Sequence, residues 1–135
     1  MRRLLVAAVV LAGVTATASS AATRHVTKGP LTGTWKGVLT DGTRTEHITF
    51  TVNAGQSAGT WFVSSTCHGA LTLDSISGGY HHYKRHNPAG SVCTGGGGGN
   101  DVDCLKRVGA NVYDSVTPRA KGWWRDGTLH RVSAT

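Results

Sequence analysis

The chain lacks the sequence features that mark several large classes of fold. No stretch repeats apolar residues every three to four positions, which excludes a bundle of amphipathic helices. No segment recurs at a fixed period, which excludes a solenoid or a propeller. Only three cysteines occur, so the chain can form one internal disulfide and must leave one thiol over.

Several catalytic and phosphate-binding motifs are also missing. Five consecutive glycines run from Gly95 to Gly99, but no Lys and Ser or Thr follow them as a phosphate-cradling P-loop requires. We interpret this run as a mobile loop. The chain has no Gly-x-Ser-x-Gly motif, and thus no sequence signal for a serine hydrolase elbow.

Long apolar runs are absent beyond the first residues. Residues 4–14 are apolar, but a bilayer span needs about 20 residues, so we expect no membrane span. A basic start precedes this run and small residues follow it, which is the layout of a secretory signal peptide. We predict a signal peptide over 1–22, cleaved after Ala22, with Ala18 as the other site. A lead-in over 23–30 and a single β domain over 31–135 follow.

The positive charge is moderate and dispersed. The formal net charge is +7, and without Arg2 and Arg3 the remaining 12 basic and 7 acidic residues leave about +5. No basic run reaches the density of a nucleic-acid-binding arm, so we expect no specific nucleic-acid partner. The charge favours weak attraction to anionic cell-wall polymers or lipid surfaces, or simply solubility.

The three cysteines allow three different disulfides in an exported chain. Cys67 can pair with Cys93, Cys67 with Cys104, or Cys93 with Cys104, and the spacing does not choose among them. The remaining thiol is expected to be buried or to join two chains.

Alternation with a period of two predicts that the domain is all-β. In the segment 43–52, Glu46, Ile48, Phe50 and Val52 share one side of a strand. In the segment 59–73, Trp61 and Val63 face one way and Phe62 the other, and Leu71 and Leu73 again share a face. Further strands are expected over 31–40, 80–86, 101–108, 112–116, 121–125 and 128–132.

Glycine pairs mark the expected turns. Asp41-Gly42, Gly78-Gly79 and Asp126-Gly127 each separate two alternating runs, and Asp-Gly is a strong hairpin signal. In the segment 101–108, Val102, Cys104 and Val108 lie on one side. We therefore predict a small antiparallel β-barrel or curled sheet of seven to eight strands.

The histidine-rich segment 80–86 carries the best candidate for catalysis. On a strand, His82, Lys84 and His86 share one face, and His81, Tyr83 and Arg85 share the other. A small secreted ribonuclease-like hydrolase would use such histidines as acid and base, with Lys84 stabilising charge and Glu46 as another base. His82 and His86 lie about 13 Å apart on a strand, too far for one metal ion. We expect neither metal nor other cofactor.

Four tryptophans are the candidates for ligand contacts. They could stack on a carbohydrate or peptide, or serve as core residues: Trp35, Trp61, Trp123 and Trp124. Trp123 and Trp124 are adjacent, so in a regular strand only one of them faces the core. Gly33 and Gly37 flank Trp35, which indicates close approach of a neighbour or ligand.

Several short motifs resemble a β-rich extracytoplasmic domain of actinobacterial secreted proteins and receptor-type serine/threonine kinases. The motifs lie at 33–37, 59–61, 67–73, Cys93 and 129–131. The resemblance implies a small barrel, a Cys67–Cys93 bridge and a sensing or binding role. The chain departs from it at 63–66, where a Tyr-Pro approach is expected, and in the extra Gly95 to Gly99 run and Cys104. The Gly33-x-Trp35 start is also similar to lipocalins.

We therefore expect a secreted, extracellular, non-catalytic domain that binds a small molecule, a cell-wall polymer or an envelope protein. The alternatives are the small hydrolase described above and a structural envelope protein in which Cys104 joins two chains. A monomer is the expected state.

Overall fold

The computed structural model describes residues 29–88, 92–93, 101–117 and 125–132. These residues form eight strands. The signal peptide over 1–22, most of the lead-in over 23–30, the glycines from Gly95 to Gly99, and Trp123 and Trp124 lie outside the described residues. The strands are β1 (Gly33–Thr40), β2 (Thr45–Val52), β3 (Ala58–Ser64), β4 (Cys67–Ser77), β5 (Tyr80–His86), β6 (Val102–Val108), β7 (Asn111–Thr117) and β8 (Arg125–Arg131).

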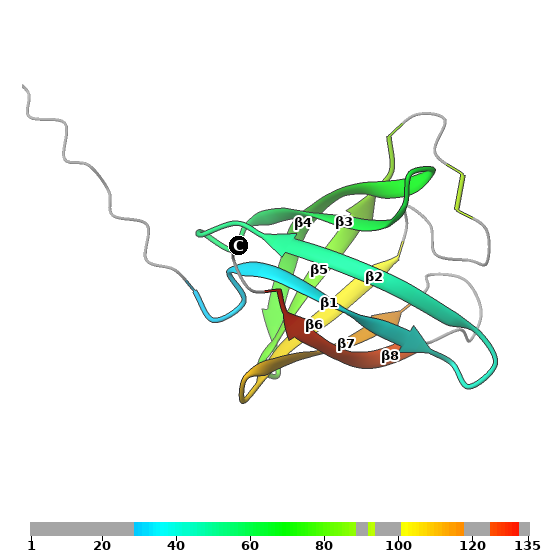
Figure 1. Cartoon of the computed structure of the whole chain (residues 1–135). Coiled ribbons are helices and arrows are strands. Elements are labelled where there is room, and N and C mark those ends of the chain that lie inside the picture. The colour runs from blue at the N-terminus through cyan, green and yellow to red at the C-terminus, as the bar shows by residue number, and fades with distance from the viewer. Residues whose placement is uncertain (1–28, 89–91, 94–100, 118–124, 133–135) are drawn as a thin grey trace, which may run out of the picture.

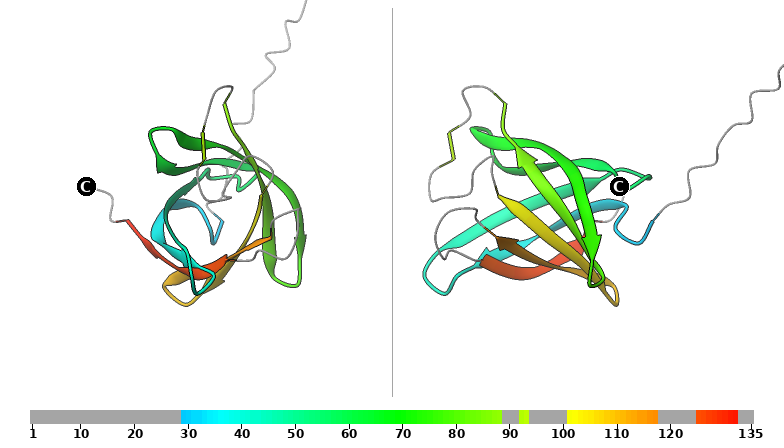
Figure 2. Two further views of the ribbon diagram at one scale, coloured as in Figure 1. Left: turned by 90° about the vertical axis from the view of Figure 1, so that its right-hand side faces the viewer. Right: turned by 180° about the vertical axis from the view of Figure 1, so that it is seen from behind.

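The strands close into an antiparallel barrel, as Figures 1 and 2 show. Each strand pairs with the next one along the chain, and β8 returns to pair with β1 through Trp35 and Arg131. Because the barrel is closed, every strand has a paired neighbour on both sides. Closed barrels thereby avoid the exposed sheet edges through which β proteins aggregate. The prediction of a small antiparallel β-barrel is confirmed, with eight strands. No helix in the described part of the chain is long and apolar enough to cross a bilayer.

Two of the predicted turns form hairpins. Gly78 and Gly79 both have positive φ and join β4 directly to β5, with Ser77 opposite Tyr80. Asp41 and Gly42 also lie in a turn, but only Gly42 has positive φ and β2 begins at Thr45 rather than at residue 43. The Asp41 carboxylate accepts hydrogen bonds from the backbone N–H groups of Thr43 and Arg44, which stabilises the wider turn.

The predicted hairpin at Asp126-Gly127 is wrong, because both residues lie inside β8. Asp126 pairs with Ser115 of β7 on one side and with Thr40 of β1 on the other. A Cβ atom at Gly127 would clash with the carbonyl oxygen of Val38. Glycine is therefore present for close packing of two strands and not for a turn.

The predicted faces of the strands are correct where the structure describes them. Ile48, Phe50 and Trp61 are buried inside the barrel, and Phe62 is exposed outside. On β6 the apolar side of Val102, Cys104 and Val108 faces outward, whereas Asp103 and Leu105 are buried inside. On hydrophobicity alone, the side of β6 with the valines and the cysteine would be expected to face the core. The structure instead turns the other side inward and so buries the charged Asp103.

One end of the barrel is closed by apolar packing around Trp35, and we call it the Trp35 end. The predicted first strand begins at Gly33 rather than at residue 31, and Leu31 turns inward and is buried. The Trp35 Nε1–H donates to the Leu31 carbonyl oxygen at 2.7 Å. The guanidinium groups of Arg107 and Arg131 lie 4.7 and 4.5 Å from the centre of the Trp35 ring. Trp35 is therefore a core residue of this end, covered by cations.

A disulfide joins Cys67 to Cys93, as the family resemblance implied. It connects the start of β4 to the segment between β5 and β6, across 26 residues of sequence. The third cysteine, Cys104, remains a thiol.

Candidate ligand-binding site

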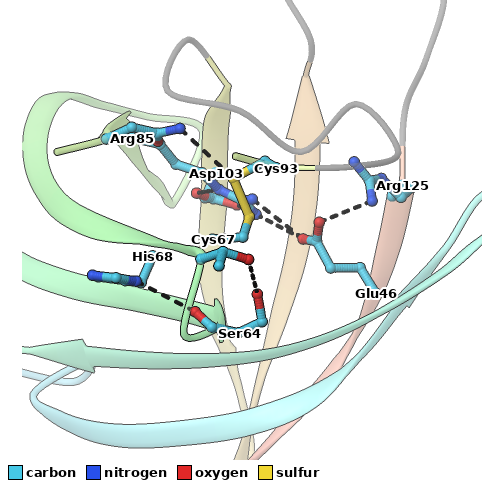
Figure 3. The surroundings of a disulfide bond; sticks show 10 residues. Glu46, Ser64, Cys67, His68, Arg85, Cys93, Asp103 and Arg125 are labelled. Carbon is cyan, nitrogen blue, oxygen red and sulfur yellow. Dashed lines mark hydrogen bonds and ion pairs between the residues drawn. A yellow bond between two sulfur atoms is a disulfide. The ribbon is translucent and has the colours of Figure 1, made fainter. Parts of the chain in front are cut away.

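Six charged side chains of the described residues are buried. One of them, Asp101, precedes β6, and the other five lie inside the barrel, toward the end opposite Trp35. We call them the charged cluster, and they come from five strands: Glu46, Arg85, Asp103, Asp114 and Arg125. Each occupies an inward position of its strand, since successive side chains point to opposite faces. Figure 3 shows four of them beside the disulfide. We call the end of the barrel that holds the charged cluster the charged end.

Arg85 is the centre of the charged cluster. Its Nε and Nη2 donate to the two Asp103 oxygens at 2.7 and 2.8 Å, which is the two-bond geometry preferred by Arg and carboxylate. Its Nη1 and Nη2 both donate to Glu46 Oε1 at 3.2 Å. Burial alone lowers the pKa of Arg85, but the Asp103 and Glu46 carboxylates outweigh it and raise the pKa above its ordinary value. Arg85 is therefore a fixed positive charge.

Arg125 extends the charged cluster to the start of β8. Its Nη1 donates to Glu46 Oε2 at 2.9 Å, so Glu46 binds one guanidinium through each of its oxygens. This bond uses one of the five N–H groups that a guanidinium carries.

Asp114 is the least compensated member of the charged cluster. Its side chain is fully buried, and neither carboxyl oxygen receives a hydrogen bond from an N–H or O–H donor of the described residues. Burial and the nearby Asp103 charge raise the pKa of Asp114 well above its ordinary value, against the opposing effect of Arg85. A protonated Asp114 carries an O–H that can reach the Asp103 carboxylate, and the cluster then balances two guanidiniums with two carboxylates.

Trp61 adds a second buried polar group without a partner. Its ring lies under Arg85, with 4.9 Å between the guanidinium carbon and the ring centre. Its Nε1–H is buried and has no hydrogen-bond acceptor among the described residues. The charged end therefore presents one unprotonated oxygen of the Asp114 carboxyl, to which no described N–H or hydroxyl group donates, and an unused donor on Trp61.

The charged cluster is a poor way to stabilise a barrel. Replacing a buried ion pair by well-packed apolar residues is often neutral or stabilising by about 1–4 kcal/mol. A buried polar group without a partner costs about 1–3 kcal/mol. Stability of the barrel therefore does not by itself account for the network of charges or for the unpartnered Trp61 Nε1–H among the described residues.

The histidine-rich strand does not bring its candidate catalytic residues together. Tyr83 and Arg85 are buried and His86 is exposed, which confirms the predicted faces of β5. Lys84 forms an ion pair with Asp74, whereas His82 hydrogen-bonds to Ser77 and contacts Cys104. Burial and the neighbouring His82 lower the pKa of His81.

Metal-binding geometry is absent from the described residues. No group of three or more His, Cys, Asp or Glu side chains there is placed to hold a metal ion.

The predicted tryptophan contacts have different positions in the structure. Trp35 is buried at the closed end, where Arg107 and Arg131 cover it, and Trp61 is buried beside the charged cluster. The predictions for Trp123 and Trp124 fall outside the described residues. Of the four, Trp61 is thus the one that the structure places beside other polar groups able to bind a ligand.

The outer wall carries a shallow groove of about 440 Å³. It lies where the ladder between β2 and β3 ends at Thr49 and Phe62, while β2 continues to pair with β1 as far as Thr45. Its lining combines exposed apolar side chains, Val38 and Phe62, with Lys36 and His47. The groove offers contact area, whereas the unpartnered buried polar groups lie inside the barrel.

Sequence reasoning missed Arg85 and Asp103 as partners. Both were visible as charged residues at inward positions: Arg85 has the parity of buried Tyr83, and Asp103 alternates with outward Val102 and Cys104. A charge on the buried side of a predicted strand is the signal that would have identified them.

Comparison with known proteins gives no further assignment. No family model, no curated protein and no solved structure matches the chain.

Proposed function

We propose that the protein is a secreted, non-catalytic binding domain that holds a small polar ligand at the charged end of its barrel. The observation that carries this proposal is the buried Trp61 Nε1–H without a described acceptor, beside Arg85 and near an Asp114 carboxyl to which no described N–H or hydroxyl group donates. Buried polar groups in folded proteins are almost always hydrogen-bonded, so an exception requires an explanation. A bound ligand supplies the missing partners.

The chemistry of these groups defines the class of ligand. The Asp114 carboxyl favours a ligand with an N–H or O–H donor, while Trp61 Nε1–H favours an acceptor such as a carboxylate or carbonyl oxygen. The ring of Trp61 adds an apolar surface. We therefore propose a small zwitterionic or polar molecule, in preference to a cell-wall polymer or an envelope protein, because the groups that would bind it are buried.

Binding fits the charged cluster better than catalysis does. Glu46 is bound by the guanidiniums of Arg85 and Arg125, and Asp103 is bound by Arg85, so the oxygens of both carboxylates are already engaged within the fold. General acid–base catalysis needs a group free to come within hydrogen-bond reach of the reacting proton. The Cys67–Cys93 disulfide is compatible with an oxidising extracellular location and supports secretion.

Native mass spectrometry of the non-reduced protein from culture supernatant tests this proposal. We expect additional mass on the wild-type monomer, and loss of that mass in Asp114→Asn and Trp61→Phe. Phe62→Leu is the matched control, because Phe62 neighbours Trp61 but is exposed on the outer wall. A bare wild-type monomer that no free amino acid stabilises against heat would contradict the proposal, as would equal retention in all variants.

A further inference from the structure

We propose that Cys104 is a reactive thiol, activated by His82, that undergoes exchange with small disulfides. The two side chains meet across neighbouring strands, because His82 of β5 lies directly opposite Cys104 of β6. Cys104 Sγ is 3.2 Å from His82 Nδ1, and His82 Nε2 is 2.9 Å from Ser77 Oγ of β4. Three strands therefore contribute a thiol, a base and a group that orients the base.

This arrangement is the one that activates a nucleophile. A thiol reacts as its thiolate, and an imidazole within hydrogen-bond distance can accept the thiol proton. With its proton on Nε2, the His82 ring donates to Ser77 Oγ and leaves Nδ1 as the acceptor for the thiol. Ser77 thereby holds the plane of the ring, and its hydroxyl oxygen can accept from Nε2–H in the tautomer that activates the thiol.

Cys104 lies on the outer wall of the barrel. It is half-buried, whereas the adjacent Asp103 points inward to Arg85. Cys104 lies opposite Ser115 of β7 on one side and opposite His82 on the other, and His82 lies opposite Ser75 of β4. The side chains beyond the Cys104–His82 pair in this row are therefore short.

The same face carries charges of both signs. Lys106 follows Cys104 by two residues and places Nζ 5.1 Å from the centre of the Tyr80 ring. Lys84 pairs with Asp74, and Asp126 of β8 lies opposite Ser115 and accepts from the Tyr113 hydroxyl. The hydrogen bond to His82, rather than a surplus of cations, is therefore what distinguishes this thiol.

The proposed step is balanced with a small disulfide, R–S–S–R, as the oxidant. The proton of Cys104 moves to His82 Nδ1, and the thiolate attacks one sulfur of the disulfide. The Cys104–S–S–R bond forms, the R–S–S–R bond breaks, and the departing R–S⁻ takes the proton from His82. Cys104 is oxidised and one R–SH is released. The step does not depend on the ligand proposed for the barrel interior.

The rate of exchange with 2,2′-dithiodipyridine between pH 5 and pH 9 tests the proposal. An ordinary thiol loses reactivity about tenfold per pH unit below about 8.5, because its thiolate fraction falls. We expect the wild type to keep its rate at lower pH and to exceed His82→Gln by about tenfold or more at pH 6. Ser77→Ala should show a smaller loss of the same kind.

Matched controls separate activation from folding and from other sites. His86→Gln changes an exposed histidine of the same strand and should keep the wild-type pH profile, while Cys104→Ser should not react. Intact mass after incubation with 2-hydroxyethyl disulfide should show one mixed disulfide on the wild type. The same pH profile in wild type and His82→Gln would overturn the proposal, and so would a Cys104-linked dimer in place of the mixed disulfide.

Discussion

The two ends of the barrel interior are built on opposite principles. At the Trp35 end, apolar side chains fill the space, and the one polar atom of Trp35 is satisfied by Leu31. At the charged end, the five members of the charged cluster occupy inward positions of their strands, and the buried Trp61 Nε1–H has no acceptor among the described residues. The buried N–H of Trp35 therefore has its acceptor within the described fold, whereas the buried N–H of Trp61 at the charged end still requires one.

This difference separates the part of the interior that stabilises the barrel from the part that we propose binds a ligand. Burial of apolar surface contributes roughly 25 cal/mol per Å², so the Trp35 end stabilises the fold directly. Buried charges lose their hydration, and pairing returns only part of that free energy. We interpret the Trp35 end as the stabilising half and the charged end as the binding half.

Truncation at the Trp35 end should give one of the two largest losses of stability. Trp35→Ala removes a fully buried ring and its hydrogen bond, and we expect a loss of about 3–5 kcal/mol in the free energy of unfolding, measured by urea denaturation. This loss should be nearly independent of pH between 4 and 8, because burial of the apolar ring accounts for most of it. A loss below about 1 kcal/mol would contradict the role assigned to this end.

Removal of the central charge should cost as much at neutral pH but less in acid. Arg85→Met leaves Glu46 and Asp103 buried without their shared cation, and we expect a loss of about 3–5 kcal/mol at pH 7. Because the two carboxylates can then neutralise by binding protons, the loss should shrink toward pH 4. Urea denaturation at several pH values distinguishes this variant from Trp35→Ala, and a loss that does not depend on pH would remove the distinction.

The disulfide at the charged end should have the next largest effect. The double variant Cys67→Ser/Cys93→Ser removes a cross-link between residues 26 positions apart and so gives the unfolded chain more conformational freedom. We expect a loss of about 2–4 kcal/mol in the free energy of unfolding. Cys104→Ser is the control and should change stability little, because Cys104 is outside the disulfide. Equal stability of the double variant and the control would show that the bridge does not support this end.

Local alternation was sufficient to predict much of the fold. The segment around Glu46 and Ile48 alternates strictly, and the structure places those residues inside one strand. Asp126-Gly127 misled because the same dipeptide suits a turn and a crowded strand. Only the approach of the Val38 carbonyl, which comes from a residue far away in the sequence, decides between them.

The site was less predictable than the fold for a physical reason. Alternation places Arg85 and Asp103 on inward faces, but their pairing depends on the register between β5 and β6, which are separated by a long connection. The contact between His82 and Cys104 depends on the same register. The residues of the charged cluster and the Cys104–His82 pair are therefore brought together by the register between distant strands, which local alternation does not reveal.

The pH dependence of the stability of Asp114→Asn relative to wild type tests whether the interior of the charged end holds a poorly compensated carboxyl. The folded state keeps the Asp114 proton, whereas the unfolded chain releases it above about pH 3.9, so wild-type stability falls as pH rises. Comparison with the variant cancels the other titrating groups, including His81.

We predict that the stability gain of Asp114→Asn is small near pH 4 and grows with pH. It should grow by up to about 1.4 kcal/mol per pH unit until Asp114 ionises in the folded protein. A variant that is less stable than wild type, increasingly so at higher pH, would show that Asp114 is a well-compensated structural charge and would contradict the account.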